Sequence, residues 1–429
     1  MGGGDETVLT MPYSPGGVTG KVRVPPSKSL TQRALVAAAL AGRGSVVRHP
    51  LDAEDPRLLA AALRGAGYGL EWGADSVTAH GRTPVRHGAF HLGNNGTGVR
   101  FMVAQLAALE GEWTVDGTER LRLRPIAPLV TALRQLGATV GPVHGGELAL
   151  PLRVAGAALP GGEVALDAST SSQFVSALLL LGAALPDGVV VKLVSAPPSR
   201  PYLALTAEVL AAFGGRVTET AAGELESRGG GLVPAEFTVE GDWSAAAVPL
   251  AAAAVAGGRV EVAGVRPDSR QGDAAVLAIL ARAGCRVDAT REGVALTGPA
   301  SRPVAANLRD APDLFPALAA VAAVSGGRLD GLQGLAAKES DRLAVMTRHL
   351  SALGYEAARG EGWFAAPGGV PRPATEVAPL DPAADHRIAM ALAVVGCVVP
   401  GVRVSDPGCV AKSWPGFWVA WRSLVSGAS

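Results

Sequence analysis

The sequence predicts an α/β protein of two domains, and three observations predict it. Five apolar, helix-like stretches each end in a glycine and lead into a strand-like segment. The chain of 429 residues is 48% hydrophobic, which is enough material for more than one core. Groups of polar residues precede apolar helices repeatedly along the chain. Together these patterns favour a small βα unit that is used several times.

The closing glycines are the strongest sign of repetition. They are Gly67, Gly137, Gly214, Gly284 and Gly354, and subtraction gives separations of 70, 77, 70 and 70 residues. Glycine is favoured just past a helix because it adopts the left-handed conformation without steric cost. One such glycine is ordinary helix capping, but five at nearly one period indicate a repeated unit. A sixth, degraded copy would end at Gly427. We therefore expect six copies in two groups of three.

The expected domain boundary lies where strand ends meet proline or glycine before a new helix. The segments VPPSKS, near the start, and VEGDWS, from Val239 to Ser244, both have this form. We predict one three-repeat domain at residues 26–240 and a second built from residues 1–25 and 241–429. The chain would cross between the domains twice, and two crossings would make a hinge.

The composition excludes several classes of partner. Lys plus Arg equals Asp plus Glu at 38 each, so no overall charge attracts nucleic acid or an anionic membrane. The three cysteines lie far apart, which favours a reducing compartment, and the seven histidines show no HxH or HExxH pattern of a metal site. The first residues lack a signal-peptide pattern, and the longest uncharged apolar run is too short for a bilayer. We expect a cytoplasmic protein without nucleic-acid or membrane partners.

Polar groups open the helices expected in PPSKSLTQR, GNNGTGVR, STSSQF, RDAPDLFP, KESDR, DHRIAMA and DPGCVAKSWP. Helix N-termini present free N–H groups and the positive end of the helix dipole, so they attract anions. Lys28, Ser29 and Arg33 add an ammonium, a hydroxyl and a guanidinium to one of them. The alternative is a capped surface helix with ordinary basic residues. Asp313 has two possible roles, and both stay open. It is either a negative charge favoured by the helix dipole or a carboxylate that handles a proton.

Several of these segments together indicate one strongly anionic ligand. STSSQF is a dense set of neutral donors suited to a polyhydroxylated or phosphorylated ligand, although serines also cap helices for structural reasons. The small residues of GNNGTGVR allow close backbone approach or simply form a strand-to-helix turn. Later segments add cations and carboxylates, namely Lys338, Glu339, Arg342, Arg387 and Lys412.

In their order along the chain, these motifs resemble those of the 5-enolpyruvylshikimate-3-phosphate synthase family, the 3-phosphoshikimate 1-carboxyvinyltransferases. SKSLTQRAL resembles the family's SKSxxxRAL, GNNGTGVRF its GNxGTxxR and STSSQF its SSQF. Matches continue with LRLRPI, SRPY, VEGDWS, QGD, PDLFP, KESDRL, DHRIAMA and DPGCVAKSWP, from about Val24 to Phe417. The resemblance implies the two-domain enolpyruvyl transferase fold. In it, each domain has three βαβαββ repeats, with helix N-termini facing the interdomain cleft.

The resemblance also implies a reaction. The enolpyruvyl group of phosphoenolpyruvate passes to the 5-hydroxyl of shikimate 3-phosphate, and phosphate leaves through a tetrahedral adduct. This step of the shikimate pathway leads to chorismate and the aromatic amino acids. The implied partners are these two small molecules, with no cofactor and no metal, and we expect a monomer. Glyphosate targets the family, and the retained Gly96 favours sensitivity.

The implied site is assigned residue by residue. Shikimate 3-phosphate would be bound by Lys28, Ser29, Arg33, Ser171, Ser172, Gln173, Ser199, Asp313 and Lys338. Phosphoenolpyruvate would be bound by Lys28, Gly96, Arg124, Gln173, Arg342, Arg387 and Lys412. Asp313 is the predicted base for the 5-hydroxyl and Glu339 the group that exchanges the carbon proton. Lys28 would stabilise charge and share in proton transfer.

Departures from the family pattern and two alternatives complete the prediction. Gly334 and Ala336 stand where polar residues are usual, so no side-chain contact from Gly334 carries over. Asn95 stands where alanine or serine is common, beside the phosphoenolpyruvate residues and the expected glyphosate site. One alternative is the sister transferase acting on UDP-N-acetylglucosamine, whose reactive cysteine is missing here before Cys285. The other is a catalytically silent ligand-binding protein of the same fold, against which the intact candidate catalytic residues argue.

Overall fold

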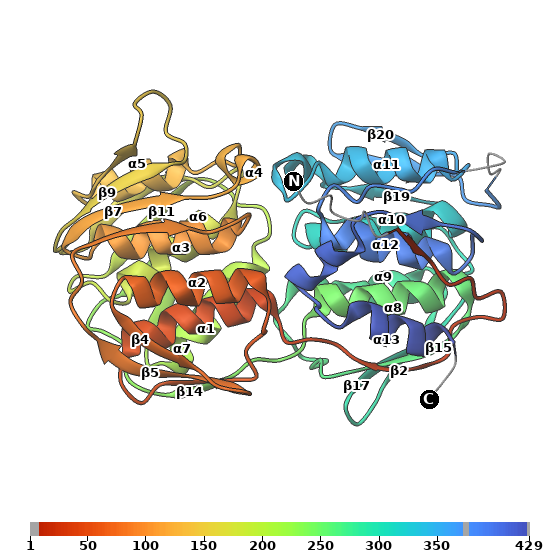
Figure 1. Cartoon of the computed structure of the whole chain (residues 1–429), viewed down its shortest axis with the longest axis horizontal. Helices are drawn as coiled ribbons and strands as arrows, with labels where there is room; N and C mark the ends of the chain where they lie inside the picture. The colour runs from red at the N-terminus through yellow and green to blue at the C-terminus, as the bar shows by residue number, and fades with distance from the viewer. Residues whose placement is uncertain (1–7, 372–376, 427–429) are drawn as a thin grey trace, which may run out of the picture. The chain divides into compact units, whose positions relative to one another are not determined.

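The computed structural model describes residues 8–371 and 377–426, so the predicted repeat end at Gly427 lies outside the described residues. The chain divides into two compact units (Figure 1). Unit 1 consists of Met1–Pro25 and Gly241–Ser429, and unit 2 of Pro26–Glu240. Each of the two hydrophobic cores is built from residues of one unit.

Unit 2 contains three four-stranded sheets. Their strand orders are β14 (Glu236–Thr238), β3 (Val46–Arg48), β5 (Ser76–Arg82), β4 (Tyr68–Trp72); β6 (His87–His91), β7 (Gly111–Asp116), β9 (Leu152–Gly156), β8 (Thr139–Pro142); and β10 (Gly162–Asp167), β11 (Val189–Ser195), β13 (Leu225–Arg228), β12 (Arg216–Glu219). In each sheet the first two strands are parallel and the other pairs are antiparallel. This is the predicted βαβαββ unit, and in the first sheet the opening strand comes from the far end of the segment.

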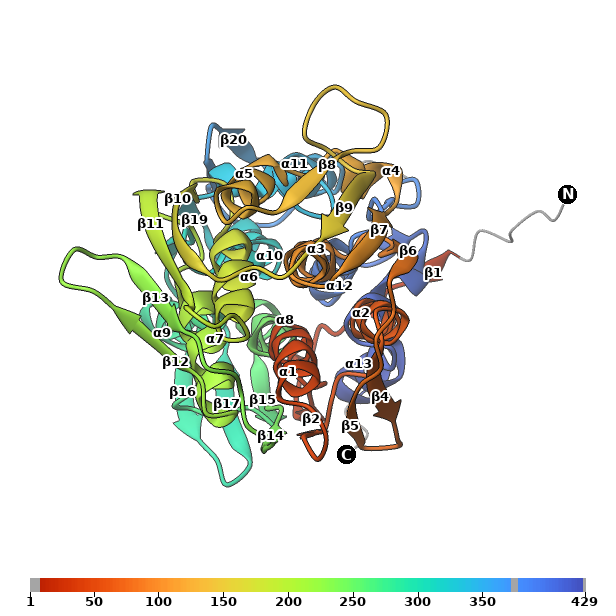
Figure 2. The ribbon, with the colours of Figure 1, turned by 90° about the vertical axis from the view of Figure 1, so that its left-hand side faces the viewer.

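Helices connect the strands of each repeat in unit 2. They are α1 (Lys28–Ala41) and α2 (Glu54–Gly65), α3 (Gly96–Ala107), the short α4 (Glu119–Arg122) and α5 (Ala127–Gln135), and α6 (Ser172–Gly182) and α7 (Pro201–Ala212). Figure 2 shows α1, α3 and α6 in the middle of the unit, with the strands outside them. These three helices are buried along almost their whole length, and in α1 and α3 the buried residues include the polar side chains Arg33, Arg100 and Gln105.

Unit 1 repeats the plan with two four-stranded sheets and one reduced sheet. The full sheets have the orders β16 (Arg286–Ala289), β17 (Gly293–Gly298), β15 (Gly258–Ala263), β2 (Gly20–Arg23) and β18 (Val304–Asn307), β19 (Gly327–Asp330), β21 (Trp363–Ala366), β20 (Ala358–Gly360). The reduced sheet pairs β1 (Leu9–Thr10) with β22 (Arg403–Val404), and Leu380 adds a parallel bridge to Val404. The described part of the sixth repeat therefore forms a smaller sheet than each of the other five repeats.

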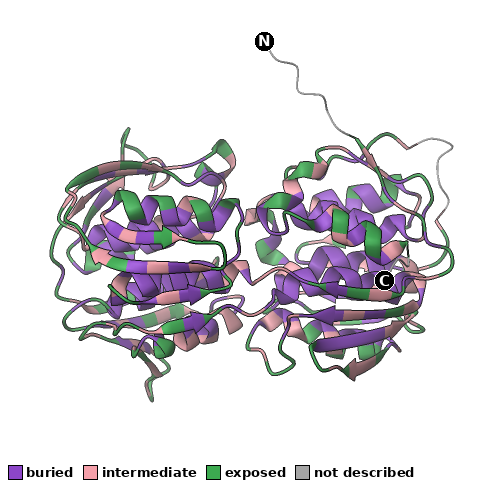
Figure 3. Cartoon of the chain, turned by 60° about the horizontal axis from the view of Figure 1, so that its bottom comes forward, coloured by how far each residue is buried: buried purple, intermediate pink, exposed green. Residues whose placement is uncertain are grey.

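The helices of unit 1 follow the same order. They are α8 (Trp243–Ala256), the 3₁₀ turn η1 (Gly272–Ala275) and α9 (Val276–Arg282); η2 (Pro312–Leu314), α10 (Phe315–Ser325), η3 (Gln333–Ala337) and α11 (Arg342–Ala352); and α12 (His386–Gly396), η4 (Pro407–Lys412) and α13 (Phe417–Val425). α8 and α10 are rich in alanine and valine on every side and form the centre of the core. Figure 3 shows buried residues along the central helices of each unit.

The repeat-closing glycines behave as predicted. Gly67, Gly137, Gly214, Gly284 and Gly354 have φ angles of 97°, 93°, 78°, 98° and 88°. Each lies two residues past the second helix of its repeat, where the chain turns back toward the sheet. The glycine period is thus the period of the fold, because every repeat needs the left-handed turn at the same place.

Among residues 8–371 and 377–426, no helix has the length and apolar character to cross a membrane. In the same part of the chain, no group of three or more His, Cys, Asp or Glu side chains is placed to hold a metal ion.

Candidate active site

The N-terminus of α1 carries the predicted Lys28 and Ser29. Ser27 caps this helix by accepting from the backbone N–H of Leu30 at 3.5 Å. Lys28 Nζ donates to Asp55 Oδ2, in the first turn of α2, at 2.9 Å. Both side chains are largely buried, so this ion pair is only weakly screened by solvent. Asp55 therefore sets the direction of the lysine ammonium.

Arg33 lies one turn further along α1 and is 1% exposed. Its Nε donates to Thr206 Oγ1 at 2.8 Å, its Nη1 to the Ser29 carbonyl at 3.0 Å and its Nη2 to Ser176 Oγ at 3.2 Å. Burial lowers the pKa of Arg33 to about 10, so it remains charged at neutral pH. The guanidinium thus fixes α1 to α6 and α7, and its predicted contact with substrate stays a prediction.

The N-terminus of α3 brings Gly96 against Arg124. A Cβ on Gly96 would lie 2.5 Å from Arg124 Nη2, so glycine is needed for this close approach. Arg124 follows the short α4, is mostly buried and donates from Nη1 to the Asn94 carbonyl at 3.3 Å. Two residues predicted for phosphoenolpyruvate therefore touch each other.

The N-terminus of α6 is connected to α3 by an arginine outside the predicted set. Ser171 caps α6 by accepting from the Gln173 backbone N–H at 3.2 Å, and Ser172 is buried beside it. Arg100 Nη1 donates to Gln173 Oε1 at 2.5 Å, and Arg100 Nη2 donates to the Pro125 carbonyl at 2.6 Å. Arg100 thus orients the amide of Gln173 and holds the segment next to Arg124.

Ser199, the remaining candidate of unit 2, precedes α7. Its φ is 57°, in the left-handed region that non-glycine residues rarely adopt. The Ser199 carbonyl accepts from the Tyr202 backbone N–H at 3.1 Å, and the residue is 8% exposed. Backbone conformations of this kind concentrate at functional sites, which makes Ser199 a stronger candidate than its sequence alone does.

In unit 1 the predicted residues gather around Arg342, at the start of α11. Arg342 is 1% exposed. Its Nη1 donates to Asp313 Oδ1 at 2.6 Å, its Nη2 to Glu339 Oε2 at 2.8 Å and its Nε to Asp385 Oδ2 at 2.8 Å. Burial would lower the pKa of Arg342, but the three carboxylates outweigh it and raise that pKa. One guanidinium therefore holds both predicted proton-handling carboxylates.

Asp313 is surrounded by cations. Besides Arg342, the Nζ of Lys338 lies 3.4 Å from its Oδ1 and the Nη2 of Arg387 lies 3.2 Å from its Oδ2. Burial opposes ionisation, but Arg387, Lys338 and Arg342 together hold the pKa of Asp313 well below its usual range. The three cations therefore favour the ionised form of Asp313 at neutral pH and make it a weak base while no substrate is bound.

Asp385 organises the same cluster from the N-terminus of α12. Its carboxylate caps the helix by accepting from the Arg387 backbone N–H at 3.0 Å. It also accepts from Ser340 Oγ at 3.0 Å, in addition to Arg342. Lys412 ends η4 and is 7% exposed. Asp385 therefore connects Ser340, the residue after Glu339, to α12, the helix that carries Arg387.

A second buried carboxylate of unit 1 lies at η1. Asp273 is 3% exposed and accepts from the hydroxyl of Ser244, in the first turn of α8. Burial and the charge of Asp313 raise its pKa to about 7, while Arg387 opposes that rise. Asp273 thus belongs to the same charge cluster as Asp313, although QGD was recognised in the sequence only as a motif without an assigned role.

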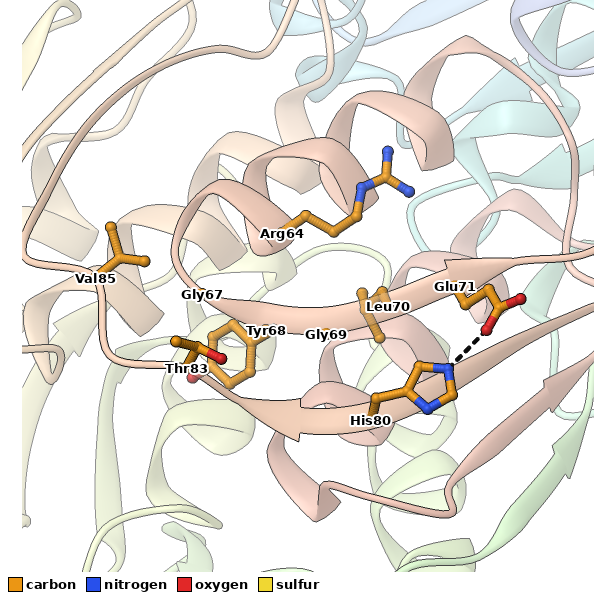
Figure 4. Close-up of a pocket in the computed structure, with 9 residues that line it drawn as sticks. All are labelled: Arg64, Gly67, Tyr68, Gly69, Leu70, Glu71, His80, Thr83 and Val85. Atoms are coloured by element: carbon orange, nitrogen blue, oxygen red, sulfur yellow. Dashed lines mark hydrogen bonds and ion pairs between the residues drawn. The ribbon is translucent and has the colours of Figure 1, made fainter.

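One surface hollow lies away from these residues. It is lined by α2, β4 and β5, and Figure 4 shows His80 and Glu71 at one end and Val85 at the other. The His80 ring nitrogen Nε2 and Glu71 Oε2 are 2.8 Å apart. None of the predicted site residues lines this hollow, so the hollow is not part of the candidate site.

Sequence reasoning missed Asp55, Arg100 and Asp385 as site-forming residues. Arg100 and Asp385 stand inside the motifs GNNGTGVR and DHR, so the motifs offered a signal without a role. Asp55 stands in no motif, and only the packing of α2 brings its carboxylate to Lys28.

Comparison with known proteins decides the family. Residues 12–421 match the family model of EPSP synthase, 3-phosphoshikimate 1-carboxyvinyltransferase. The chain belongs to this family.

Its relatives agree over nearly their whole length. The chain is 38% identical to the 3-phosphoshikimate 1-carboxyvinyltransferase of Syntrophobacter fumaroxidans, covering 96% of this chain and 98% of the relative. It is 39% identical to that of Halobacterium salinarum, covering 96% and 97%. The solved EPSP synthase of Acinetobacter baumannii superposes with a TM-score of 0.76 at 27% identity, covering 97% of each chain.

These findings confirm the predicted fold and the predicted enzyme class. The chain has the two-domain fold of the EPSP synthase family and is an enolpyruvyl transferase of the shikimate pathway. The alternative of transfer to UDP-N-acetylglucosamine is not favoured by any of these matches. The roles of individual residues and the domain boundary at residues 26–240 stay predictions.

Proposed function

We propose that this chain transfers the enolpyruvyl group of phosphoenolpyruvate to the 5-hydroxyl of shikimate 3-phosphate. The observation that carries the proposal is the arrangement at Arg342, where one buried guanidinium holds Asp313 and Glu339. The reaction needs a base for a hydroxyl and an exchanger for a carbon-bound proton. Two carboxylates on one rigid cation meet that need, because each keeps a fixed position with respect to the other.

The substrate assignments follow the charges. Lys28, Ser29, Arg33, Ser171, Ser172, Gln173, Ser199, Asp313 and Lys338 are proposed for shikimate 3-phosphate. Lys28, Gly96, Arg124, Gln173, Arg342, Arg387 and Lys412 are proposed for phosphoenolpyruvate. Both substrates are multiply charged anions and repel each other, so the site must supply preorganised cations. Arginines suit the phosphate and carboxylate because their planar forks bind oxyanions at two points.

The proposed chemistry begins with addition. Asp313 takes the proton of the 5-hydroxyl while the hydroxyl oxygen bonds to C2 of phosphoenolpyruvate, and C3 gains a proton from Glu339, which enters this step in its protonated form and leaves it as a carboxylate. The result is a tetrahedral adduct with a methyl group. In the elimination, Glu339 removes a proton from that methyl, the double bond re-forms and the C2–O bond to phosphate breaks. The phosphate leaves with the electrons of that bond and takes the proton held by Asp313, so both carboxyl groups return to their starting forms. Lys28 stabilises the charge that develops on the oxygens.

Substrate binding would also tune Asp313. In the ligand-free protein three cations hold its pKa low, which makes it a weak base. When Arg342 and Arg387 pair with phosphoenolpyruvate, their charge is shared with the ligand. The pKa of Asp313 then rises towards the range in which a carboxylate accepts a proton readily. Binding of the first anion thus prepares the base for the second.

The assay that tests the function measures phosphate release from the purified chain with both substrates, with each omitted, and with UDP-N-acetylglucosamine as a competing acceptor. The proposal predicts release only when phosphoenolpyruvate and shikimate 3-phosphate are both present, with an enolpyruvyl ether as product. Release only with the sugar nucleotide would move the chain to the sister reaction. Binding without release would overturn the catalytic claim. We also propose inhibition by glyphosate, a cytoplasmic location and a monomer.

A further inference from the structure

Asn95 occupies a junction between three helices. It is the N-cap of α3 and is 1% exposed. Its Oδ1 accepts from the backbone N–H of Gly98 at 2.8 Å, which is an ordinary capping bond. Its Nδ2 donates to the backbone carbonyl of Asp55 at 2.8 Å. Alanine at this position has no side-chain donor, and serine carries its single hydroxyl on a side chain that is one atom shorter than the amide of asparagine.

The second bond reaches Lys28 through one residue. Asp55 lies in the first turn of α2, whose N-cap Ala53 makes no side-chain capping bond. The carbonyl of Asp55 is held by Asn95, and its carboxylate accepts from Lys28 Nζ at 2.9 Å. The position of the lysine ammonium therefore depends on how firmly the first turn of α2 is held.

Gly98 makes room for this arrangement. A Cβ at position 98 would lie 2.3 Å from Asn95 Nδ2 and 2.8 Å from its Cγ. The Asn95 amide thus occupies the volume that any larger residue at 98 would need. Asn95 and Gly98 form a matched pair, since the amide adopts this pose only beside a glycine.

We propose that Asn95 is a positioning residue for Lys28, acting through Asp55, and that it requires glycine at position 98. The inference rests on the proposed function in one respect, which is the role of Lys28 in binding both substrates. Loss of the Asn95–Asp55 bond lets the first turn of α2 move and loosens the Lys28–Asp55 pair. Because Lys28 serves both substrates, the KM of each rises together, and kcat/KM falls roughly tenfold for the loss of one buried hydrogen bond.

The variants separate capping from positioning. Asn95→Ser keeps an oxygen for the Gly98 N–H and replaces the amide donor to Asp55 by a hydroxyl on a shorter side chain, whereas Asn95→Ala removes both bonds. Gly98→Ala leaves Asn95 in the chain but displaces its amide. Gln135→Ala is the matched control, because Gln135 also accepts from one backbone N–H and donates to one carbonyl, both of Ala165. It lies in α5 and contacts none of the residues proposed for substrate.

The decisive readout is the rate at which acetic anhydride labels Lys28 in the full chain without substrates, measured by mass spectrometry of the Lys28 peptide. We expect a several-fold faster rate in Asn95→Ser, Asn95→Ala and Gly98→Ala, and the wild-type rate in Gln135→Ala. Adding Gly98→Ala to Asn95→Ala should have almost no further effect, because the space is already vacant. Thermal unfolding of each variant reports whether it is folded.

The outcomes are distinct. Wild-type labelling of Lys28 in folded Asn95→Ser and Asn95→Ala proteins, with a lower unfolding temperature only, would overturn the inference and leave Asn95 as a plain helix cap. Fully additive effects of the Asn95 and Gly98 changes would overturn the matched pair. Faster labelling of Lys28 in variants of a chain that releases no phosphate would support the inference, because labelling does not depend on turnover. The same result would contradict the proposed function.

Discussion

The two units place their candidate residues with different chemistry, although they share one repeat. In unit 2 the central helices α1, α3 and α6 are capped by neutral side chains, Ser27, Asn95 and Ser171. In unit 1 the helices α8, α11 and α12 are capped by aspartates, Asp242, Asp341 and Asp385, while α10 has no side-chain cap. Unit 2 orients its groups mainly by neutral hydrogen bonds, and unit 1 by buried charges.

The difference teaches how one repeat serves two tasks. Neutral caps leave a helix N-terminus electropositive, which suits the binding of phosphate and carboxylate groups. Aspartate caps neutralise that end, but they also anchor arginines such as Arg342 next to the carboxylates of the proton-transfer steps. We therefore expect changes in unit 1 to act through charge and pH, and changes in unit 2 to act through substrate affinity.

The largest expected effect comes from breaking the charge cluster of unit 1. Arg342→Ala leaves Asp313, Glu339 and Asp385 without their shared cation, and we expect a loss of about 3–5 kcal/mol in unfolding free energy. Urea unfolding at neutral pH measures it. Arg286→Ala is the control, since its pair with Asp288 is largely exposed and should cost less than about 1 kcal/mol. Equal losses in the two variants would contradict the account of Arg342.

The next effect separates catalysis from binding inside unit 1. Glu339→Gln keeps the size and a hydrogen-bonding oxygen near Arg342 but removes the group that exchanges the carbon proton. We expect kcat to fall roughly a hundredfold while both KM values change much less. Steady-state phosphate release measures both quantities. Near-normal turnover would remove Glu339 from the mechanism.

A smaller effect is expected in unit 2 and should appear as affinity. Gly96→Ala places a Cβ 2.5 Å from Arg124 Nη2, so the guanidinium must move. We expect the KM of phosphoenolpyruvate to rise roughly tenfold and that of shikimate 3-phosphate to change little, because only the former is assigned to Arg124. The matched control is Gly334→Ala, whose Cβ would have no atom within 4 Å. A similar rise in both KM values would argue against the assignment of Arg124.

The smallest effect is a pH dependence that belongs to unit 1. The folded-state pKa of Asp273 is raised to about 7 by burial and by the charge of Asp313. The folded protein therefore binds an extra proton between its ordinary pKa near 4 and pH 7, and stability falls as the pH rises through this window. Asp273→Asn should remove that fall. The free energy of unfolding at pH 8, relative to its value at pH 5, should then be higher than in the wild type by on the order of 1 kcal/mol.

The control for this pH effect is Asp268→Asn. The Arg266 guanidinium lowers the pKa of the exposed Asp268, so its titration lies below the window. Urea unfolding at pH 5 and pH 8 compares the wild type and both variants. An unchanged slope in Asp273→Asn would show that Asp273 does not titrate in this range.

Much of the fold could be predicted because each repeat carries sequence signals that depend only on neighbouring residues. Glycine at the same turn of each repeat, such as Gly67 and Gly284, is required by a positive φ that the residue itself permits. The buried helices α8 and α10 were recognisable because they are apolar on every side. These signals depend only on near neighbours in the chain.

The detailed geometry of the site could not be predicted, because it depends on residues far apart in the sequence. Arg342 and Asp385 are separated by 43 positions, and no spacing rule indicates that one neutralises the other. Arg33 was predicted to contact a substrate, and nothing in the sequence indicated that packing against α6 and α7 buries it. The departure at Asn95 was visible in the sequence, while its bond to Asp55 was not.

The measurement that tests the central claim most directly is the mass of the enolpyruvyl product formed in D₂O. If Glu339 protonates C3 and later removes a proton from the resulting methyl group, the product made by the wild-type chain carries deuterium in its methylene group. The label should appear at a much lower rate with Glu339→Gln. Product formed at the normal rate without deuterium would contradict the addition–elimination chemistry, and with it the role assigned to the carboxylates held by Arg342.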